Sequence, residues 1–61
     1  PGCYVRLDNG AIVWLQRVWY CKGKGLASND CFRGYNCDEN LQLLGEKHRE
    51  DFCRFNISEK L

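Results

Sequence analysis

The residues most able to do chemistry in this chain of 61 residues are five cysteines and one histidine. The cysteines are Cys3, Cys21, Cys31, Cys37 and Cys53. Such a density in a short chain is typical of a disulfide scaffold made in an oxidising compartment. Because the number is odd, one thiol is free, pairs with another molecule, or has its partner outside this sequence. The sequence therefore predicts a secreted, disulfide-stapled protein, with a disulfide-linked dimer as one way to use the odd cysteine.

The same side chains include a set of possible zinc ligands. Cys31, Cys37, His48 and Cys53 have the donor types that tetrahedral zinc accepts. The first pair is more widely spaced than in compact zinc sites, and on a helix His48 and Cys53 would lie on different faces. We therefore expect no metal or other cofactor, and a zinc-stabilised interaction module is kept as an alternative.

Nucleophilic catalysis would need a cysteine within hydrogen-bond reach of His48. On one helix, Cys37 and His48 would lie about 16 Å apart along the axis. No other residues indicate an oxyanion hole, so we expect a protein that is not an enzyme. A free Cys37 at a helix start would have a lowered pKa and high reactivity, but the simpler prediction is that Cys37 is bridged and anchors that helix.

The clearest structural signal is Asn9-Gly10 between two β-prone segments, which is typical of a two-residue hairpin turn. A two-residue loop places Val5 opposite Trp14. One face of the hairpin then carries the residues that make the better core: Cys3, Val5, Leu7, Ile12 and Trp14.

The second strand of this hairpin is predicted to continue to Cys21. Cys21 would then lie about 17 Å beyond the residue opposite Cys3, and bridged Cα atoms must be within about 7 Å of each other. We therefore expect no Cys3–Cys21 bridge, and expect both residues to bond to cysteines in the second half of the chain.

The second half of the chain shows a helical pattern. Asn36 and Glu39 have the spacing of a capping box, and apolar or aromatic residues then recur at steps of three and four: Leu41, Leu44, His48, Phe52 and Phe55. A short third strand is possible over residues 31–35, a helix is predicted over 37–54, and residues 56–61 are expected to fray. The predicted fold is α+β, with an N-terminal antiparallel hairpin and a C-terminal helix packed on the sheet.

Length and charge limit the class of protein further. Sixty-one residues predict one domain, 1–61. No apolar stretch is long enough to span a membrane, and a net charge of +1 gives no reason to expect nucleic-acid binding.

We expect a toxin- or effector-like binding protein that acts by contact with a target macromolecule, a protein or receptor. Exposed aromatic residues beside basic ones are typical contact residues, and the candidates are Tyr4, Arg17, Trp19, Lys22, Lys24 and Arg33, with the Lys22–Asp30 loop. The same aromatic residues make a carbohydrate-binding module, with a polysaccharide partner, an alternative. Asn56-Ile57-Ser58 is a glycosylation sequon, so Asn56 is a candidate for an N-linked glycan.

Overall fold

The protein is an antiparallel β-structure, seen in a computed structural model that describes residues 2–16, 21, 27 and 29–61. Its strands are β1 (Cys3–Leu7), β2 (Ile12–Leu15), β3 (Cys31–Cys37), β4 (Arg49–Cys53) and β5 (Ile57–Lys60). They form one sheet in the order β4-β3-β2-β1-β5. A short 3₁₀ helix, η1 (Arg54–Asn56), connects β4 to β5, which are the two outer strands of this sheet.

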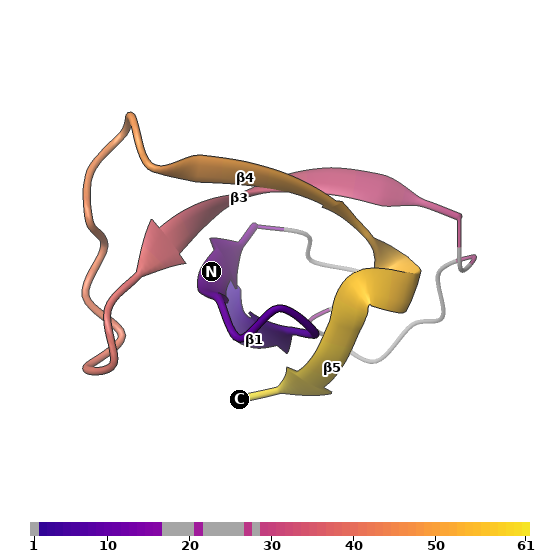
Figure 1. The fold of residues 1–61 in the computed structure, drawn as a ribbon. Helices are drawn as coiled ribbons and strands as arrows, with labels where there is room; N and C mark the ends of the chain where they lie inside the picture. Colours follow the sequence, from indigo (N-terminus) through magenta and orange to yellow (C-terminus); the bar gives the residue numbers. More distant parts are fainter. Residues whose placement is uncertain (1, 17–20, 22–26, 28) are drawn as a thin grey trace.

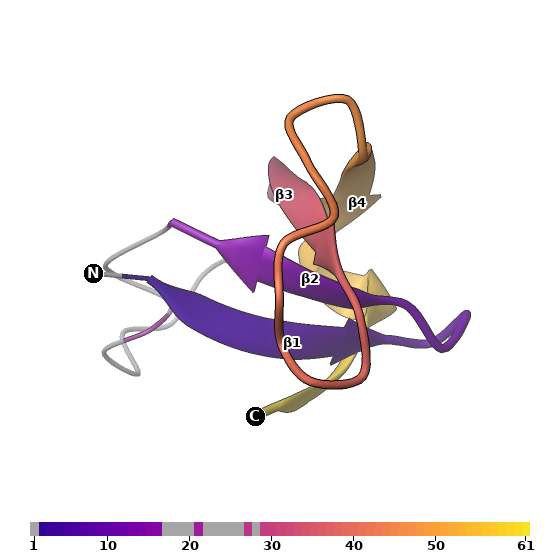
Figure 2. The ribbon, with the colours of Figure 1, turned by 90° about the vertical axis from the view of Figure 1, so that its left-hand side faces the viewer.

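The sheet curls into a half-barrel. β3 and β4 arch over β1, while β5 turns back beneath them (Figure 1). The view turned by 90° shows β3 and β4 crossing steeply over the direction of β1 and β2 (Figure 2). η1 joins the two ends of this curl, since the Asn56 carbonyl accepts the Asp8 N–H at 2.8 Å and the Asp30 carbonyl accepts the Arg54 N–H at 2.7 Å.

The predicted β1–β2 hairpin is present, but its register differs by one residue from the prediction. Leu7 and Ala11 enclose a three-residue loop, with hydrogen bonds from Leu7 N–H to the Ala11 carbonyl and from Gly10 N–H to the Leu7 carbonyl. Gly10 takes a φ of +91°, as the last residue of such a loop requires. Val5 consequently lies opposite Val13 and not opposite Trp14.

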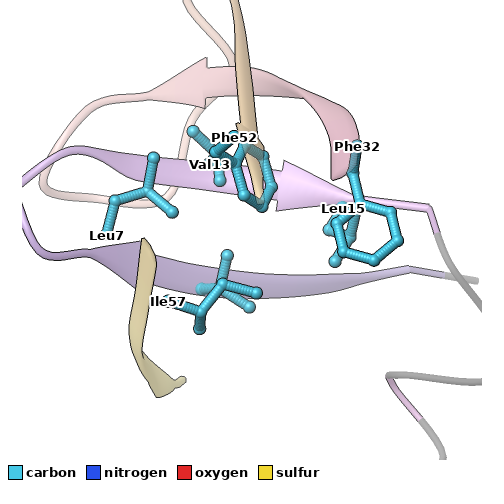
Figure 3. Close-up of a cluster of buried hydrophobic side chains, with 7 residues drawn as sticks. Leu7, Val13, Leu15, Phe32, Phe52 and Ile57 are labelled. Atoms are coloured by element: carbon cyan, nitrogen blue, oxygen red, sulfur yellow. The ribbon is translucent and has the colours of Figure 1, made fainter. Parts of the chain in front are cut away.

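Because side-chain direction alternates along a strand, this shift of one residue places every side chain of β2 on the face opposite to the one predicted. Val13 and Leu15 are buried, whereas Ile12 and Trp14 are only partly buried. Seven buried residues fill the concave face of the half-barrel (Figure 3): Val5, Leu7, Val13, Leu15, Phe32, Phe52 and Ile57. The prediction of Ile12 and Trp14 as core residues was therefore wrong.

Gly34 allows β3 and β4 to pack closely over this core. A Cβ atom at Gly34 would lie 2.9 Å from Cε1 of Phe52 and 3.1 Å from Cβ of Val13. Contacts this short are repulsive, so only glycine fits here without movement of the neighbouring strands.

The predicted C-terminal helix is absent, and residues 29–61 contain no α-helix. The α+β fold is therefore corrected to an all-strand fold. The predicted short strand at 31–35 is part of β3, and β4 pairs with it from Cys31 opposite Cys53 to Tyr35 opposite Arg49. Residues 57–60, expected to fray, form β5 against β1. The apparent helical stripe divides accordingly, with Phe52 buried in the core and Leu44 and Phe55 exposed.

Two disulfides hold the described chain, Cys3–Cys21 and Cys31–Cys53. The first contradicts the prediction against a Cys3–Cys21 bridge. That prediction assumed a strand extending straight to Cys21, but β2 ends at Leu15, the residue opposite Cys3. Cys21 lies close to that end, with its Sγ 3.6 Å from the Leu15 carbonyl oxygen. The Cα atoms of Cys3 and Cys21 are consequently 5.7 Å apart.

Candidate functional site

A row of aromatic and basic side chains crosses the outer face of the sheet, away from the core. Tyr4 on β1 lies opposite Trp14 on β2, Trp14 opposite Tyr35 on β3, and Tyr35 opposite Arg49 on β4. Residues directly opposite one another project from the same face. The register of the sheet therefore assembles these four residues from four strands.

The centre of this row is a set of ring contacts. The ring centroids of Trp14 and Tyr35 are 6.1 Å apart, and the rings are tilted by 45°. The Arg49 guanidinium carbon lies 5.8 Å from the centroid of the Tyr35 ring, a distance at which a cation is attracted to an aromatic face. Arg49 thus holds Tyr35 from the side opposite to Trp14.

Trp14 and Tyr35 line a groove with a volume of about 320 Å³, which we call the aromatic groove. Its other lining residues are Gln16, Leu43, Gly45 and Glu46. The volume is in the range of sites that accept a small ligand or a partner's side chain. The sheet supplies the aromatic residues, and the β3–β4 connection supplies Leu43, Gly45 and Glu46.

The β3–β4 connection, residues 38–48, carries three exposed leucines and is called the leucine loop. Leu41, Leu43 and Leu44 are 37%, 55% and 50% exposed. The loop extends from the ends of β3 and β4 at the left of Figure 1. Exposed aliphatic side chains on a loop that lines a groove are typical of an interaction surface, and Leu43 is the one that lines this groove.

Hydrogen bonds fix the shape of the leucine loop. The Asp38 carboxylate accepts the backbone N–H groups of Asn40 and Gln42, at 2.8 and 3.0 Å. The Asn36 carbonyl accepts the Leu44 N–H at 3.0 Å, and Leu43 forms a β-bridge with Cys37. Asp38 therefore organises a turn and does not belong to the start of a helix. The leucines are presented by a loop with a defined conformation.

Leu41 adopts a φ of +64°, the only positive value at a non-glycine residue in the described chain. A leucine side chain in this region costs about 1–2 kcal/mol relative to a right-handed conformation. The loop carries this cost while exposing an apolar side chain to solvent. Neither feature stabilises the fold by itself.

Cys37 is the free cysteine, and it is buried. The prediction that Cys37 is bridged was wrong. The alternative of a reactive thiol at a helix start fails as well, because Cys37 ends a strand and burial raises the pKa of its thiol, with a smaller contribution in the same direction from the Asp38 charge. Its burial gives no support to the predicted disulfide-linked dimer.

Two of the predicted contact residues, Tyr4 and Arg33, lie in the described part of the chain. Tyr4 belongs to the outer row beside Trp14. Arg33 forms an ion pair with Asp51, with Nε 2.7 Å from Oδ1, and this hydrogen bond raises the pKa of Arg33 and lowers that of Asp51. Arg17, Trp19, Lys22 and Lys24 lie outside the described residues, as does most of the Lys22–Asp30 loop.

The proposed zinc ligands do not form a set. Cys31 and Cys53 are bonded to each other, and His48 is exposed at the end of the leucine loop. Within the described part of the chain, no three histidine, cysteine or acidic side chains are grouped for a metal ion.

Sequence reasoning missed Trp14, Tyr35, Leu43 and Arg49. Trp14 was placed in the core by the two-residue turn. A three-residue loop ending at Gly10 would have placed it beside Tyr4 on the outer face. Tyr35 could then have followed from a third strand, but Leu43 and Arg49 were assigned to the predicted helix.

These features define a small, disulfide-stapled β-half-barrel with an aromatic groove on its convex face. No helix of the described residues is both long and apolar enough to cross a membrane. Comparison with protein-family models, with curated proteins and with solved structures gave no match to this chain.

Proposed function

We propose that this protein is a secreted binding protein that recognises another protein through the aromatic groove and the leucine loop. The observation that carries the proposal is that the leucine loop, held by Asp38, lines the groove through Leu43 and exposes two further leucines. A partner that covers Leu43 and Leu44 removes apolar surface from water, which favours association.

The composition of this surface matches protein interfaces. Tryptophan, tyrosine and arginine are the residues most enriched at the centres of such interfaces, and Trp14, Tyr35 and Arg49 are consecutive members of the outer row. Gln16 and Glu46 supply polar groups at the groove. We infer that the partner inserts an apolar side chain against Trp14, Tyr35 and Leu43.

Two other ligand classes fit this surface less well. A sugar ring stacks on a flat aromatic strip, but the Trp14 and Tyr35 rings are tilted by 45° and do not share a plane. A nucleic acid would bring phosphates close to Glu46, and the net charge of +1 supplies little general attraction. The exposed leucines serve neither ligand.

Secretion and the absence of catalysis complete the proposal. Two disulfides in a chain of this size support an oxidising compartment. The groove, the leucines and the outer row all fit a role in binding. None of them requires a nucleophile. The free thiol of Cys37 is buried, which supports binding without covalent chemistry.

The proposal is tested by site-specific cross-linking followed by affinity measurement. A photoreactive amino acid is placed at position 43 in one sample and at position 55 in another, because Phe55 is also exposed but belongs to η1. Both are added to extracellular material from the source organism. A protein linked from position 43 and not from position 55 is then identified and purified.

Affinity for that purified protein decides the outcome. Leu43→Ser and Leu44→Ser are each expected to weaken binding roughly tenfold through lost burial of an apolar side chain, with unchanged thermal unfolding, whereas Phe55→Ser leaves affinity unchanged. Equal losses in all three variants would overturn the surface assignment. Retention on an insoluble polysaccharide, lost in a Trp14 variant, would replace the protein partner by a carbohydrate.

A further inference from the structure

A second feature of the molecule, the η1 turn between β4 and β5, carries the sequon Asn56-Ile57-Ser58. We propose that Asn56 carries an N-linked glycan on the folded, secreted protein. The inference concerns a different side of the molecule from the aromatic groove. It rests on the secretion included in the proposed function and not on partner binding.

The side chain of Asn56 is held in one orientation. Its Oδ1 accepts the backbone N–H of Cys53 at 2.9 Å, and its backbone carbonyl accepts the N–H of Asp8 at 2.8 Å. The carbonyl side of the amide group is therefore fixed against the chain. The amide nitrogen, which is the atom that receives a glycan, lies on the other side of the same planar group.

This nitrogen keeps some contact with solvent. Asn56 is partly buried, and no buried side-chain nitrogen or oxygen lacks a hydrogen-bond partner in the described chain. The Asn56 Nδ2 makes no hydrogen bond there, so it is not a buried atom. A glycan on Nδ2 would replace contact with water, and the Oδ1 bond to Cys53 would remain.

The surroundings can accommodate a large polar group. Phe55, next to Asn56, is 65% exposed, and Ser58 to Lys60 on the adjacent strand β5 are all exposed. Figure 1 shows η1 at the opposite end of the molecule from the leucine loop. A glycan on Asn56 would therefore leave the aromatic groove uncovered.

The chemistry needs a co-substrate from the secretory pathway, a lipid-pyrophosphate-linked oligosaccharide. The Asn56 Nδ2 forms a bond to C1 of the first sugar as the bond from C1 to the pyrophosphate oxygen breaks. The proton lost from Nδ2 ends on the released lipid pyrophosphate. No electrons are exchanged with an oxidant or a reductant, and both disulfides stay intact.

The test is secretion of the full chain, behind a signal peptide, from a eukaryotic cell that supplies this co-substrate. The intact mass is expected to exceed the polypeptide mass by that of a glycan. Peptide N-glycosidase should remove the excess and convert Asn56 to aspartate. Secretion of the chain with both disulfides formed but Asn56 unmodified would overturn the proposal.

Two variants at Ser58 provide a matched control. Ser58→Ala removes the sequon and also the hydrogen bond from the Ser58 hydroxyl to the Arg6 carbonyl, whereas Ser58→Thr keeps both. We expect glycan on the threonine variant and none on the alanine variant. Near-ultraviolet circular dichroism shows whether both fold, so that loss of the glycan is distinguished from loss of structure. Equal glycan occupancy in the two variants would contradict modification at this sequon.

Discussion

At the scale of single residues, the surroundings of Cys37 determine the protonation state of its thiol. Its thiol lies 3.5 Å from the Tyr35 carbonyl oxygen, which it can approach as a weak S–H donor. Burial is the largest influence on its titration and raises its pKa, while a hydrogen bond from the Trp14 backbone acts in the opposite direction. Folding therefore favours the neutral thiol over the thiolate.

This preference makes the free energy of unfolding depend on pH in the alkaline range. Because the folded pKa is higher than the unfolded one, the folded state holds its proton at pH values where the unfolded state has lost it. The contribution is fully present below the ordinary thiol pKa of 9.0 and is lost as the pH rises through the higher folded value. The free energy of unfolding, measured with urea across this pH window, should fall more steeply with pH for the wild type than for Cys37→Ala.

The comparison with Cys37→Ala separates this effect from other groups that titrate in the same window. The variant loses a buried sulfur and is expected to be less stable at neutral pH. The difference in free energy of unfolding between the variant and the wild type should then shrink as the pH rises. Parallel pH profiles for the two proteins would show that the thiol does not contribute.

At the scale of elements, the leucine loop combines backbone strain with exposed apolar surface. Leu41→Gly removes a strain of about 1–2 kcal/mol from the left-handed conformation, and glycine returns about 0.5–1 kcal/mol of that through its greater freedom when unfolded. The free energy of unfolding should therefore stay the same or rise by up to about 1.5 kcal/mol. Partner affinity should fall, since the exposed leucine is lost.

Leu44→Gly is the matched control for Leu41→Gly. Leu44 is similarly exposed but has no positive φ, so the same change relieves no strain there and should destabilise by about 0.5–1 kcal/mol. Chemical denaturation of both variants measures the contrast. Equal destabilisation would mean that the Leu41 conformation carries no cost.

The hairpin shows how much of an element can be predicted from local residues. Asn9-Gly10 correctly located the turn, because glycine readily adopts the positive φ needed there. The loop length was not determined by that pair, since Gly10 also suits the last position of a three-residue loop. Asn9 favours the longer loop by accepting the Ala11 N–H on its side chain. One residue of register then decided whether Trp14 belonged to the core or to the candidate site.

The false helix shows the limit of periodicity. Its apolar positions matched a helical stripe, yet the stripe combined exposed loop leucines with Phe52, whose burial comes from pairing with β3. Gly45, at a φ of +132°, lies within the predicted helix and breaks it. Strand pairing and the Cys31–Cys53 bridge join residues about twenty positions apart, so no short window of sequence reports them.

At the scale of the whole molecule, the fold depends on cross-links because its core is small. A domain of this length buries only about 60 per cent of its unfolded surface, and the core contains seven buried side chains. Cys3–Cys21 ties the start of β1 to the segment after β2, and Cys31–Cys53 ties one end of β3 to the end of β4. The two bridges constrain the chain across sequence separations of 18 and 22 residues.

Removal of either bridge should therefore cost much of the stability. Chain-entropy arguments give about 3 kcal/mol for a closed loop of this size. The paired variants Cys3→Ala/Cys21→Ala and Cys31→Ala/Cys53→Ala are each expected to lower the free energy of unfolding by about this amount, and full reduction should unfold most of the chain at physiological temperature. Calorimetry with and without reductant, with intact mass to count the bridges, measures these losses. A fully reduced chain that unfolds at the same temperature as the oxidised one would show that the half-barrel is held by its core alone.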